Sequence, residues 1–183
     1  YHPDIVGIYT MVTLSRNTFR IAEMVRETLP DSLLVSGGPL PTLYPERFCA
    51  AFDVVFRGEA DLSFPQFCHD LFGKQFSRRQ LTELPLEKYA GLFIKKDEVQ
   101  IENPPVHFSE NEIETFPLPD RKDFDHAAYQ QVWLSQDGSK TTSIITTLGC
   151  PFSCDFCSRP VFGNQFRRRS LDHVFNEIGQ IHK

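Results

Sequence analysis

Continuous apolar runs alternate with amphipathic segments through the first 73 residues of the chain. The apolar runs are rich in β-branched side chains and lie at residues 4–12, 32–38 and 53–59. Strands that are buried on both faces have this continuous pattern. Because strands that alternate with helices form parallel sheets through right-handed crossovers, the pattern predicts an α/β fold. Three strands are few for such a sheet, so we expect one or two more before Tyr1 in a longer protein.

The amphipathic segments predict three helices. The first covers residues 16–30, with Ser15 as its N-cap and Pro30 as its stop. Its apolar face is predicted to comprise Ile21, Met24, Val25 and Leu29. The second helix is short, at residues 43–52, and the third is at residues 62–73.

Residues 74–140 have a different character, because prolines cluster there and acidic residues are frequent. Within this connector, residues 91–102 predict a β-hairpin that turns at Lys96-Asp97, and residues 115–124 predict an extended stretch. A plain loop of this length would be unusual, so we expect the connector to have some local structure of its own.

Regular structure is predicted again from residue 141 onward. Residues 141–149 are rich in β-branched side chains and predict a strand. A cysteine-rich loop follows, and Ser170 is the expected N-cap of a last helix. The apolar face of that helix is predicted to comprise Leu171, Val174, Phe175, Ile178 and Ile181. One strand–loop–helix unit cannot bury its own faces, so we expect this region to begin a larger second domain. The three predicted regions are residues 1–73, 74–140 and 141–183.

Composition narrows the class of protein. Hydrophobic residues make up 40% of the chain and charged residues 23%, as in ordinary globular domains. No apolar run approaches the roughly 20 residues that span a bilayer. The net charge of −5 argues against a nucleic-acid partner. Five cysteines, three of them close together, do not resemble a secreted disulfide framework, so we expect a protein of the reducing cytoplasm.

The three clustered cysteines are Cys150, Cys154 and Cys157, in the stretch "GCPFSCDFCSRP". Thiolates are soft ligands that suit zinc, copper(I) or iron–sulfur clusters. A structural zinc ion takes four protein ligands, and His173 on the predicted last helix is only a weak candidate for the fourth. Three thiolates on a 4Fe–4S cluster would leave one iron open for a substrate. The residues alone therefore allow a catalytic cluster or, alternatively, a zinc-binding knuckle in a non-catalytic α/β module that binds a protein partner.

The spacing C-x3-C-x2-C, with Phe156 before the last cysteine and Gly149 before the first, resembles the radical S-adenosylmethionine (radical SAM) signature. The resemblance implies that the three cysteines hold a 4Fe–4S cluster whose fourth iron is chelated by the amino and carboxylate groups of SAM. It also implies that Phe156 packs near the adenine and that residues 141–183 form the first βα unit of a radical SAM (β/α) partial barrel. Reductive cleavage of SAM would then give a 5′-deoxyadenosyl radical.

Basic residues follow the cysteines, at Arg159 and at Arg167–Arg169. They could offset the charge of the cluster thiolates or bind the carboxylate of SAM. Exposed charge runs usually form solvated turns. We therefore expect at least two of the three arginines in the run to be solvated.

A glycine pair, Gly37 and Gly38, ends the second predicted strand, at the edge where open α/β sheets bind ligands. Taken alone, such a pair is more often a turn. However, residues 4–73 resemble the C-terminal half of a cobalamin-binding, flavodoxin-like (Rossmann-type) domain. That family has a Ser/Thr-x-Leu element after one strand and a Gly-Gly pair after the next. The resemblance implies six cobalamin-binding residues: Thr10, Val12 (in place of Leu), Gly37, Gly38, Gly58 and Glu59.

The chain departs from the cobalamin-binding family in one respect. The family's Asp-x-His-x-x-Gly motif, whose histidine can ligate cobalt, is absent from the sequence, and His2 does not match it. A lower axial ligand is therefore not assigned. Among the other candidates, Cys49 and Cys68 are expected to be core thiols and Trp133 a packing residue. Asp120 and Arg121 are expected to form a local ion pair. The remaining histidines are expected at the surface or satisfied, namely His69, His107, His126 and His182.

The resemblance implies part of a cobalamin-dependent radical SAM enzyme, with a 4Fe–4S cluster, SAM and cobalamin as cofactors. The reaction expected first is transfer of a methyl group to an unactivated carbon, or another modification of such a carbon. The expected partners are a small-molecule substrate and an electron donor such as flavodoxin or ferredoxin, with no nucleic acid and no membrane span. No catalytic residue is assigned. Because the sequence lacks most of the barrel, including the glycine-rich SAM-binding strand, we expect these 183 residues alone to be inactive.

Overall fold

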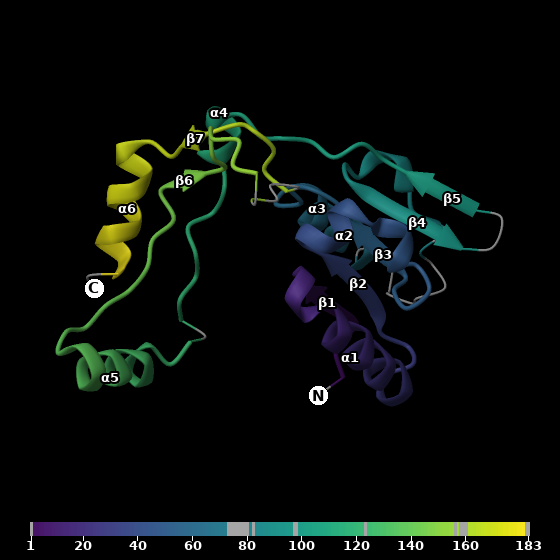
Figure 1. Ribbon diagram of the computed structural model, residues 1–183, viewed down its shortest axis with the longest axis horizontal. Helices are drawn as coiled ribbons and strands as arrows, with labels where there is room; N and C mark the ends of the chain where they lie inside the picture. The colour runs from purple at the N-terminus through teal and green to yellow at the C-terminus, as the bar shows by residue number, and fades with distance from the viewer. Residues whose placement is uncertain are drawn as a thin grey trace. The chain divides into compact units, whose positions relative to one another are not determined.

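The structure is a computed structural model, and its chain divides into two compact units (Figure 1). The first unit comprises Tyr1–His107 and Pro151–Asn164, and the second comprises Phe108–Cys150 and Gln165–Lys183. The residues that the structure describes are 2–72, 81, 83–96, 99–122, 124–155, 157 and 161–181. Within these residues, no helix is both long and apolar enough to cross a bilayer.

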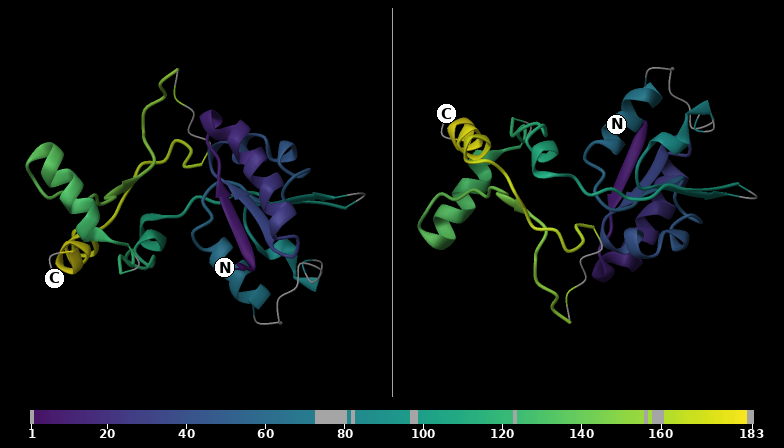
Figure 2. Two further views of the ribbon diagram at one scale, coloured as in Figure 1. Left: turned by 90° about the horizontal axis from the view of Figure 1, so that it is seen from below. Right: turned by 90° about the horizontal axis from the view of Figure 1, so that it is seen from above.

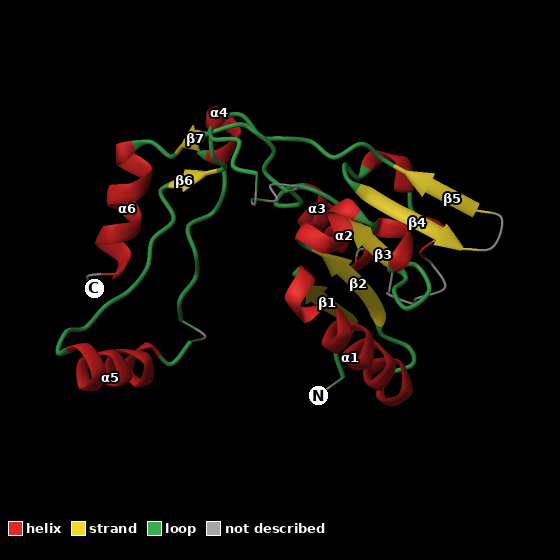
Figure 3. Cartoon of the chain, viewed as in Figure 1, coloured by secondary structure: helices red, strands yellow, loops and turns green. Residues whose placement is uncertain are grey.

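The first unit contains a five-stranded sheet in the order β1-β2-β3-β4-β5 (Figure 3). The strands are β1 (Ile5–Tyr9), β2 (Leu33–Gly37), β3 (Val54–Phe56), β4 (Leu92–Lys96) and β5 (Val99–Glu102). The first three strands are parallel, and β4 and β5 join antiparallel. The predicted α/β class and the parallel strands are thereby confirmed. The hairpin predicted at residues 91–102 also forms, and it extends the same sheet; Asp97 of its predicted turn lies outside the described residues.

Both faces of this sheet are covered, because successive side chains of a strand point to opposite sides. One buried cluster combines strand residues Leu33, Val35, Val54 and Phe56 with Phe67 and Leu71 of helix α3 (Ser63–Phe72). The other combines Leu34, Val55 and Phe93 with Ala22 of helix α1 (Ser15–Thr28) and with Phe48 and Phe52. Figure 2 shows α1 and α3 on opposite sides of the sheet. The apolar runs of β2 and β3 thus reflect strands buried on both faces, whereas β1, at the edge of the sheet, is only partly buried.

Helix α1 corrects two predictions. Ser15 is its first helical residue, and Leu14 occupies the N-cap position without a side-chain cap. The predicted apolar face is correct only in part: Val25 packs against the core, but Ile21 and Met24 are exposed, and Thr18 and Ala22 are buried instead. The small side chains of Thr18 and Ala22 let α1 lie close against the sheet. The buried face of α1 is therefore narrower and less apolar than the spacing of its apolar residues suggests.

The helix predicted at residues 43–52 is replaced by α2 (Pro39–Leu43) and a single 3-10 turn, η2 (Pro45–Arg47). Tyr44 between them has φ −134° and ψ 60°, outside the helical region. The residue before a proline avoids the α conformation, so Pro45 ends one helix and begins the next turn. Helix α3 lies where it was predicted, and the predicted closing residue Gly73 is outside the described part of the chain.

The second unit contains three helices in its described residues: α4 (Glu110–Ile113), α5 (His126–Asp137) and α6 (Leu171–Ile181). Strands β6 (Thr147–Leu148) and β7 (Arg167–Arg168) pair antiparallel. Of the strand predicted at residues 141–149, only these two residues of β6 are regular. Helix α5 was not predicted, although Asp125 caps its first turn and Gly138 ends it at φ 70°.

Helix α6 begins after Ser170, whose hydroxyl accepts a hydrogen bond from the His173 amide at 3.1 Å. This predicted cap is confirmed. The predicted apolar face is not, because Leu171, Phe175 and Ile178 are exposed. The buried residue of α6 is a charged one, Glu177.

Candidate functional site

The carboxyl edge of the sheet is the place where β1, β2 and β3 end, and it gathers the predicted cobalamin-binding residues. The Thr10 amide donates to the Gly37 carbonyl at 2.8 Å, and the Leu40 amide donates to the Thr10 carbonyl at 3.2 Å. Thr10 is fully buried, and its hydroxyl donates to that of Thr18 at 3.3 Å, so its side chain points inward. Val12, in contrast, is exposed at this edge.

Two of the three glycines at this edge, Gly38 and Gly58, are required by the chain's own packing. Gly38 has φ 102° and Gly58 has φ 70°, both in the region that favours glycine. A Cβ atom at Gly38 would lie 2.8 Å from the Tyr9 ring, and one at Gly58 would lie 2.8 Å from Cβ of Pro105. Gly37 differs, since a Cβ there would meet only the Phe56 carbonyl oxygen, at 3.5 Å. Of the three glycines, Gly37 therefore leaves the most room beside the backbone.

Thr42 joins the two glycine turns and was not predicted as a site residue. Its hydroxyl donates to the Gly38 carbonyl at 2.8 Å and accepts from the Gly58 amide at 2.9 Å. Thr42 is nearly buried, so these bonds are shielded from water. Its only sequence signal is its position four residues after Gly38 in "GGPLPT".

Glu59 is buried at the same edge, and it meets a histidine that the sequence did not single out. Nδ1 of His107 lies 3.3 Å from Oε1 of Glu59, and the side chains are 31% and 1% exposed respectively. The segment before His107 is held by Asn103, whose amide donates to the carbonyls of Leu86 and Tyr89. His107, the more exposed member of the pair, is the one that a ligand at the edge could reach.

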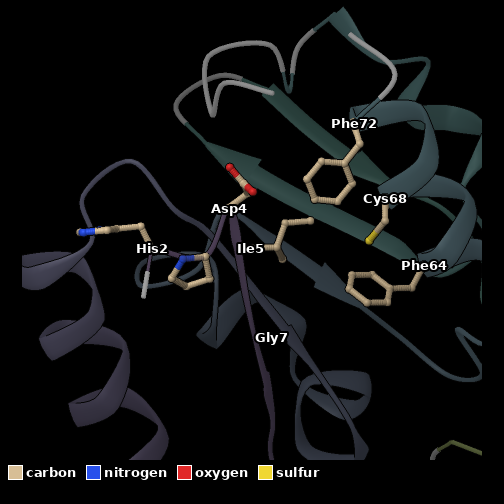
Figure 4. A pocket seen from close by; sticks show the side chains of 8 residues that line it. His2, Asp4, Ile5, Gly7, Phe64, Cys68 and Phe72 are labelled. Carbon is tan, nitrogen blue, oxygen red and sulfur yellow. The ribbon is translucent and has the colours of Figure 1, made fainter. Parts of the chain in front are cut away.

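A separate pocket of about 570 Å³ lies at the opposite end of β1, beside α3 (Figure 4). Its lining residues are His2, Pro3, Asp4, Ile5, Gly7, Phe64, Cys68 and Phe72. Burial raises the pKa of the Cys68 thiol, and the same is true of Cys49, as expected for thiols that pack against the core. Because ligands of open α/β sheets bind at the carboxyl ends of the strands, this pocket is not the predicted cofactor edge.

In the described part of the chain no disulfide joins the three motif cysteines; Cys154 and Cys157 are exposed and Cys150 is partly buried. Gly149 precedes Cys150 with φ 79°, which turns the chain sharply away from β6. The Cys157 amide donates to the Cys154 carbonyl at 3.1 Å, so these two residues share one turn. The division of the chain places Cys150 in the second unit and Cys154 and Cys157 in the first.

Three thiols, two of them exposed, are a donor set that fits an iron–sulfur cluster or zinc. Among the described residues, no group of three or more histidine, cysteine or acidic side chains is arranged so that it could hold a metal ion. The cluster assignment of Cys150, Cys154 and Cys157 therefore stays a prediction. Phe156 and Arg159, to which the sequence gave roles beside the cluster, lie outside the described residues.

The basic run after the cysteines is mostly buried, which contradicts the expectation of a solvated turn. Arg167 is 4% exposed and donates to the Phe108 carbonyl at 2.8 Å. The Arg169 side chain is also nearly buried, and only Arg168 is exposed. The run is thus part of the internal structure of the second unit.

Glu177 explains why Arg169 is buried. Its two carboxylate oxygens accept hydrogen bonds from Arg121 at 2.7 Å and from Arg169 at 2.6 Å. Burial raises the pKa of Glu177, but the hydrogen bonds and charges of the two guanidinium groups outweigh it, so the pKa lies below its ordinary value. The predicted pair of Asp120 with Arg121 is therefore wrong, and Asp120 instead lies 3.9 Å from the Lys122 ammonium.

His173, the weak candidate for a fourth metal ligand, lies within the same group of charges. Nε of Arg169 donates to its Nδ1 at 3.3 Å, and Oε1 of Glu114 lies 3.8 Å from the same nitrogen. One ring nitrogen is thus occupied by protein contacts, which favours a structural role for this residue.

No protein-family model matches the chain, but several known proteins are similar to it. The chain is 28% identical over 187 residues to an uncharacterized methyltransferase, PH0819, of Pyrococcus horikoshii, covering 100% of the chain and 37% of that protein. It is 24% identical to cytidylyl-2-hydroxyethylphosphonate methyltransferase of Streptomyces wedmorensis, covering 97% and 37%. It is 26% identical to anaerobic magnesium-protoporphyrin IX monomethyl ester cyclase of Synechocystis, covering 90% and 30%. The chain therefore spans about a third of the length of these relatives.

Among solved structures, the cobalamin-dependent S-adenosylmethionine radical enzyme OxsB has a similar fold, with a TM-score of 0.64 at 18% identity. The match covers 98% of the chain and 23% of OxsB. The relatives in sequence are methyltransferases and a cyclase, and the relative in structure combines cobalamin with radical SAM chemistry. Over nearly its whole length the chain thus resembles cobalamin-dependent radical SAM enzymes and methyltransferases, as its motifs predict.

Proposed function

We propose that this chain is part of a cobalamin-dependent radical SAM enzyme that methylates, or otherwise modifies, an unactivated carbon of a small molecule. The observation that carries the proposal is the three-cysteine motif directly after β6, in a chain whose full length aligns with methyltransferases. The similarity of fold to OxsB supports the pairing of a sheet domain for cobalamin with a cluster-binding loop.

In this proposal Cys150, Cys154 and Cys157 ligate a 4Fe–4S cluster through their thiolates. The bound cluster and SAM would supply the 5′-deoxyadenosyl radical, and the protein would position the reactants and exclude water. Phe156 would pack beside the adenine. The exposure of Cys154 and Cys157 leaves both thiols accessible to incoming iron and sulfide.

The carboxyl edge of the sheet would bind the corrinoid. Tyr9, Met11 and Val12 are exposed there, and such apolar side chains suit contact with a flat macrocycle. Gly37 would allow close approach to the backbone, whereas the glycines at 38 and 58 shape the turns on either side. Glu59 would act through His107, the more exposed member of that pair.

Cluster reduction needs an external electron, for which we propose a flavodoxin or ferredoxin as partner. The corrinoid would carry the methyl group or assist the carbon chemistry. The substrate would be a small molecule. It would bind to regions like those that the relatives have outside the part that aligns with this chain.

Anaerobic reconstitution with iron and sulfide tests the cluster. We expect a brown protein with about four irons per chain, and an EPR signal of the reduced cluster that SAM perturbs. The Cys154→Ala variant should lose the cluster, and Cys68→Ala is the matched control, because Cys68 is a thiol outside the motif. A colourless protein with one stoichiometric zinc would instead support the non-catalytic zinc knuckle. Retention of cobalamin on gel filtration tests the corrinoid half separately.

A further inference from the structure

Glu177 forms a buried ionic group with two arginines from distant parts of the second unit. The carboxylate is 2% exposed and lies on α6. Arg121 comes from the proline-rich connector, and Arg169 directly follows β7. A buried carboxylate lowers the stability of the fold unless it is paired and hydrogen-bonded. Contact with Glu177 is therefore favoured for both guanidinium groups, and this holds them in place.

The same arginines also hold the backbone that leads into the cysteine motif. Arg121 donates to the Ser143 carbonyl at 3.1 Å. The Arg169 side chain donates to the Ile145 carbonyl at 2.6 Å, and its amide donates to the Thr146 carbonyl at 3.0 Å. One carboxylate therefore orients two arginines that together bind three carbonyls within residues 143–146.

The segment that these arginines bind has little else to fix it. Residues 141–146 form no helix or strand, and β6 after them is only two residues long. Most of the segment is exposed, so apolar burial contributes little to its position. Cys150 follows β6 by two residues. The backbone that Arg121 and Arg169 bind thus lies directly before β6 and the first motif cysteine.

We propose that Glu177 is a positioning residue of the cluster loop, which through Arg121 and Arg169 sets the path of residues 143–148 and hence of Cys150. This inference rests on the proposed function for the identity of the metal group, whereas the backbone path can be tested without any metal. Glu177 itself touches neither the cluster nor SAM in this proposal.

The test compares Arg121→Lys with Arg26→Lys in the full chain. The two arginines are matched: each pairs with a carboxylate, at 2.7 and 2.8 Å, and their side chains are 26% and 29% exposed. Each also donates to one backbone carbonyl, at 3.1 and 3.2 Å, but Arg26 does so at Ser32 in the first unit. Lysine keeps the charge and loses the planar fork that binds two acceptors at once.

Hydrogen exchange in the metal-free chain is the first measurement. The protected amides here are those of the β6–β7 pair and that of Arg169, which donates to the Thr146 carbonyl. We expect Arg121→Lys and Glu177→Gln to speed their exchange several-fold, and Arg26→Lys to leave it unchanged. Equal exchange in all three variants would overturn the proposal. Arg121→Lys keeps the test valid should Glu177→Gln fail to fold.

The second measurement is made on the reconstituted chain. We expect Arg121→Lys to lose iron to a chelator several-fold faster than Arg26→Lys, with a shifted EPR spectrum of the reduced cluster, at equal fractions of folded protein. An unchanged spectrum and unchanged iron loss would overturn the link to the cluster. If the wild-type chain binds no cluster, the proposed function fails, while faster exchange at β6, β7 and the Arg169 amide in the variants would still uphold the positioning role.

Discussion

Glu59 in the first unit and Glu177 in the second are equally buried, each 2% exposed, yet they have different surroundings. Glu59 lies at the carboxyl edge of the sheet, 3.3 Å from a histidine that is 31% exposed. Glu177 lies between two guanidinium groups at 2.6 and 2.7 Å. Arginine is a permanent cation, whereas histidine can meet a carboxylate as a cation or as a neutral hydrogen-bond donor. Glu177 is thus a fixed ionic anchor of the second unit, whereas Glu59 makes a polar contact at the edge where a ligand is predicted to bind.

The largest expected effect is on Glu177. Replacing it with glutamine leaves two arginines facing each other across a neutral amide, so the free energy of unfolding should fall by about 3 kcal/mol. Denaturant unfolding measures the loss. Glu102→Gln is the control, because Glu102 also accepts from an arginine, at 2.5 Å, but is half exposed. A loss for Glu177→Gln as small as that of the control would remove the distinction between a buried anchor and a surface pair.

Low pH should abolish the difference in unfolding free energy between the wild type and Glu177→Gln. The pKa of Glu177 is lowered in the folded protein, so its ionic contribution is fully present above the ordinary glutamate pKa, near 4.3. The contribution is lost as the pH falls through the lowered folded value. The difference in unfolding free energy between wild type and Glu177→Gln should therefore be constant at neutral pH and shrink below about pH 4. Unfolding series in urea at several pH values measure it, and a difference that grows with acid would contradict the direction of this pKa shift.

The sequence predicted the parts of the fold that depend on local pattern. Three β-branched runs became parallel strands, and Ser170 caps α6 as expected. The buried face of α1 was predicted only in part and that of α6 was missed, because Ala22 and Glu177 carry no apolar periodicity. Helix α5 was missed because its apolar side chains are spread around it and none of its residues is buried. Periodicity identifies an element, but the neighbour chosen by tertiary packing decides which face is buried.

The candidate site shows the same limit. Sequence motifs located the three cysteines and the edge residues Thr10, Gly37 and Gly38. They could not indicate that His107 meets Glu59 or that Arg121 meets Glu177, since those partners are 48 and 56 residues apart. Arg121 was assigned to Asp120 because the two residues are adjacent in the sequence, which does not indicate which distant residues lie nearby in space. Pairings between distant charged residues require the fold.

Glu59→Gln should have a smaller effect than Glu177→Gln. Glutamine keeps the size of the side chain and an acceptor oxygen for His107, so the expected loss is about 1 kcal/mol. The control is Glu46→Gln, since Glu46 is 63% exposed and pairs only at the surface, with the Lys95 ammonium at 3.1 Å. If cobalamin binds at the carboxyl edge, Glu59→Gln should also weaken its retention, whereas Glu46→Gln should not. A loss of stability as large as that of Glu177→Gln would show that Glu59 is an ionic anchor too.

The smallest expected effect is on Asp120, and it tests whether burial rather than sequence adjacency decides the partner of Arg121. The Asp120 and Lys122 side chains are 69% and 90% exposed, and their charged atoms are 3.9 Å apart. Water screens such a pair, so Asp120→Asn should change the free energy of unfolding by less than about 0.5 kcal/mol. If Asp120 were the true partner of Arg121, combining Asp120→Asn with Arg121→Lys would give less than the sum of the single losses. We expect the two losses to add, whereas Glu177→Gln and Arg121→Lys should fall clearly short of additivity, because both disrupt one buried group.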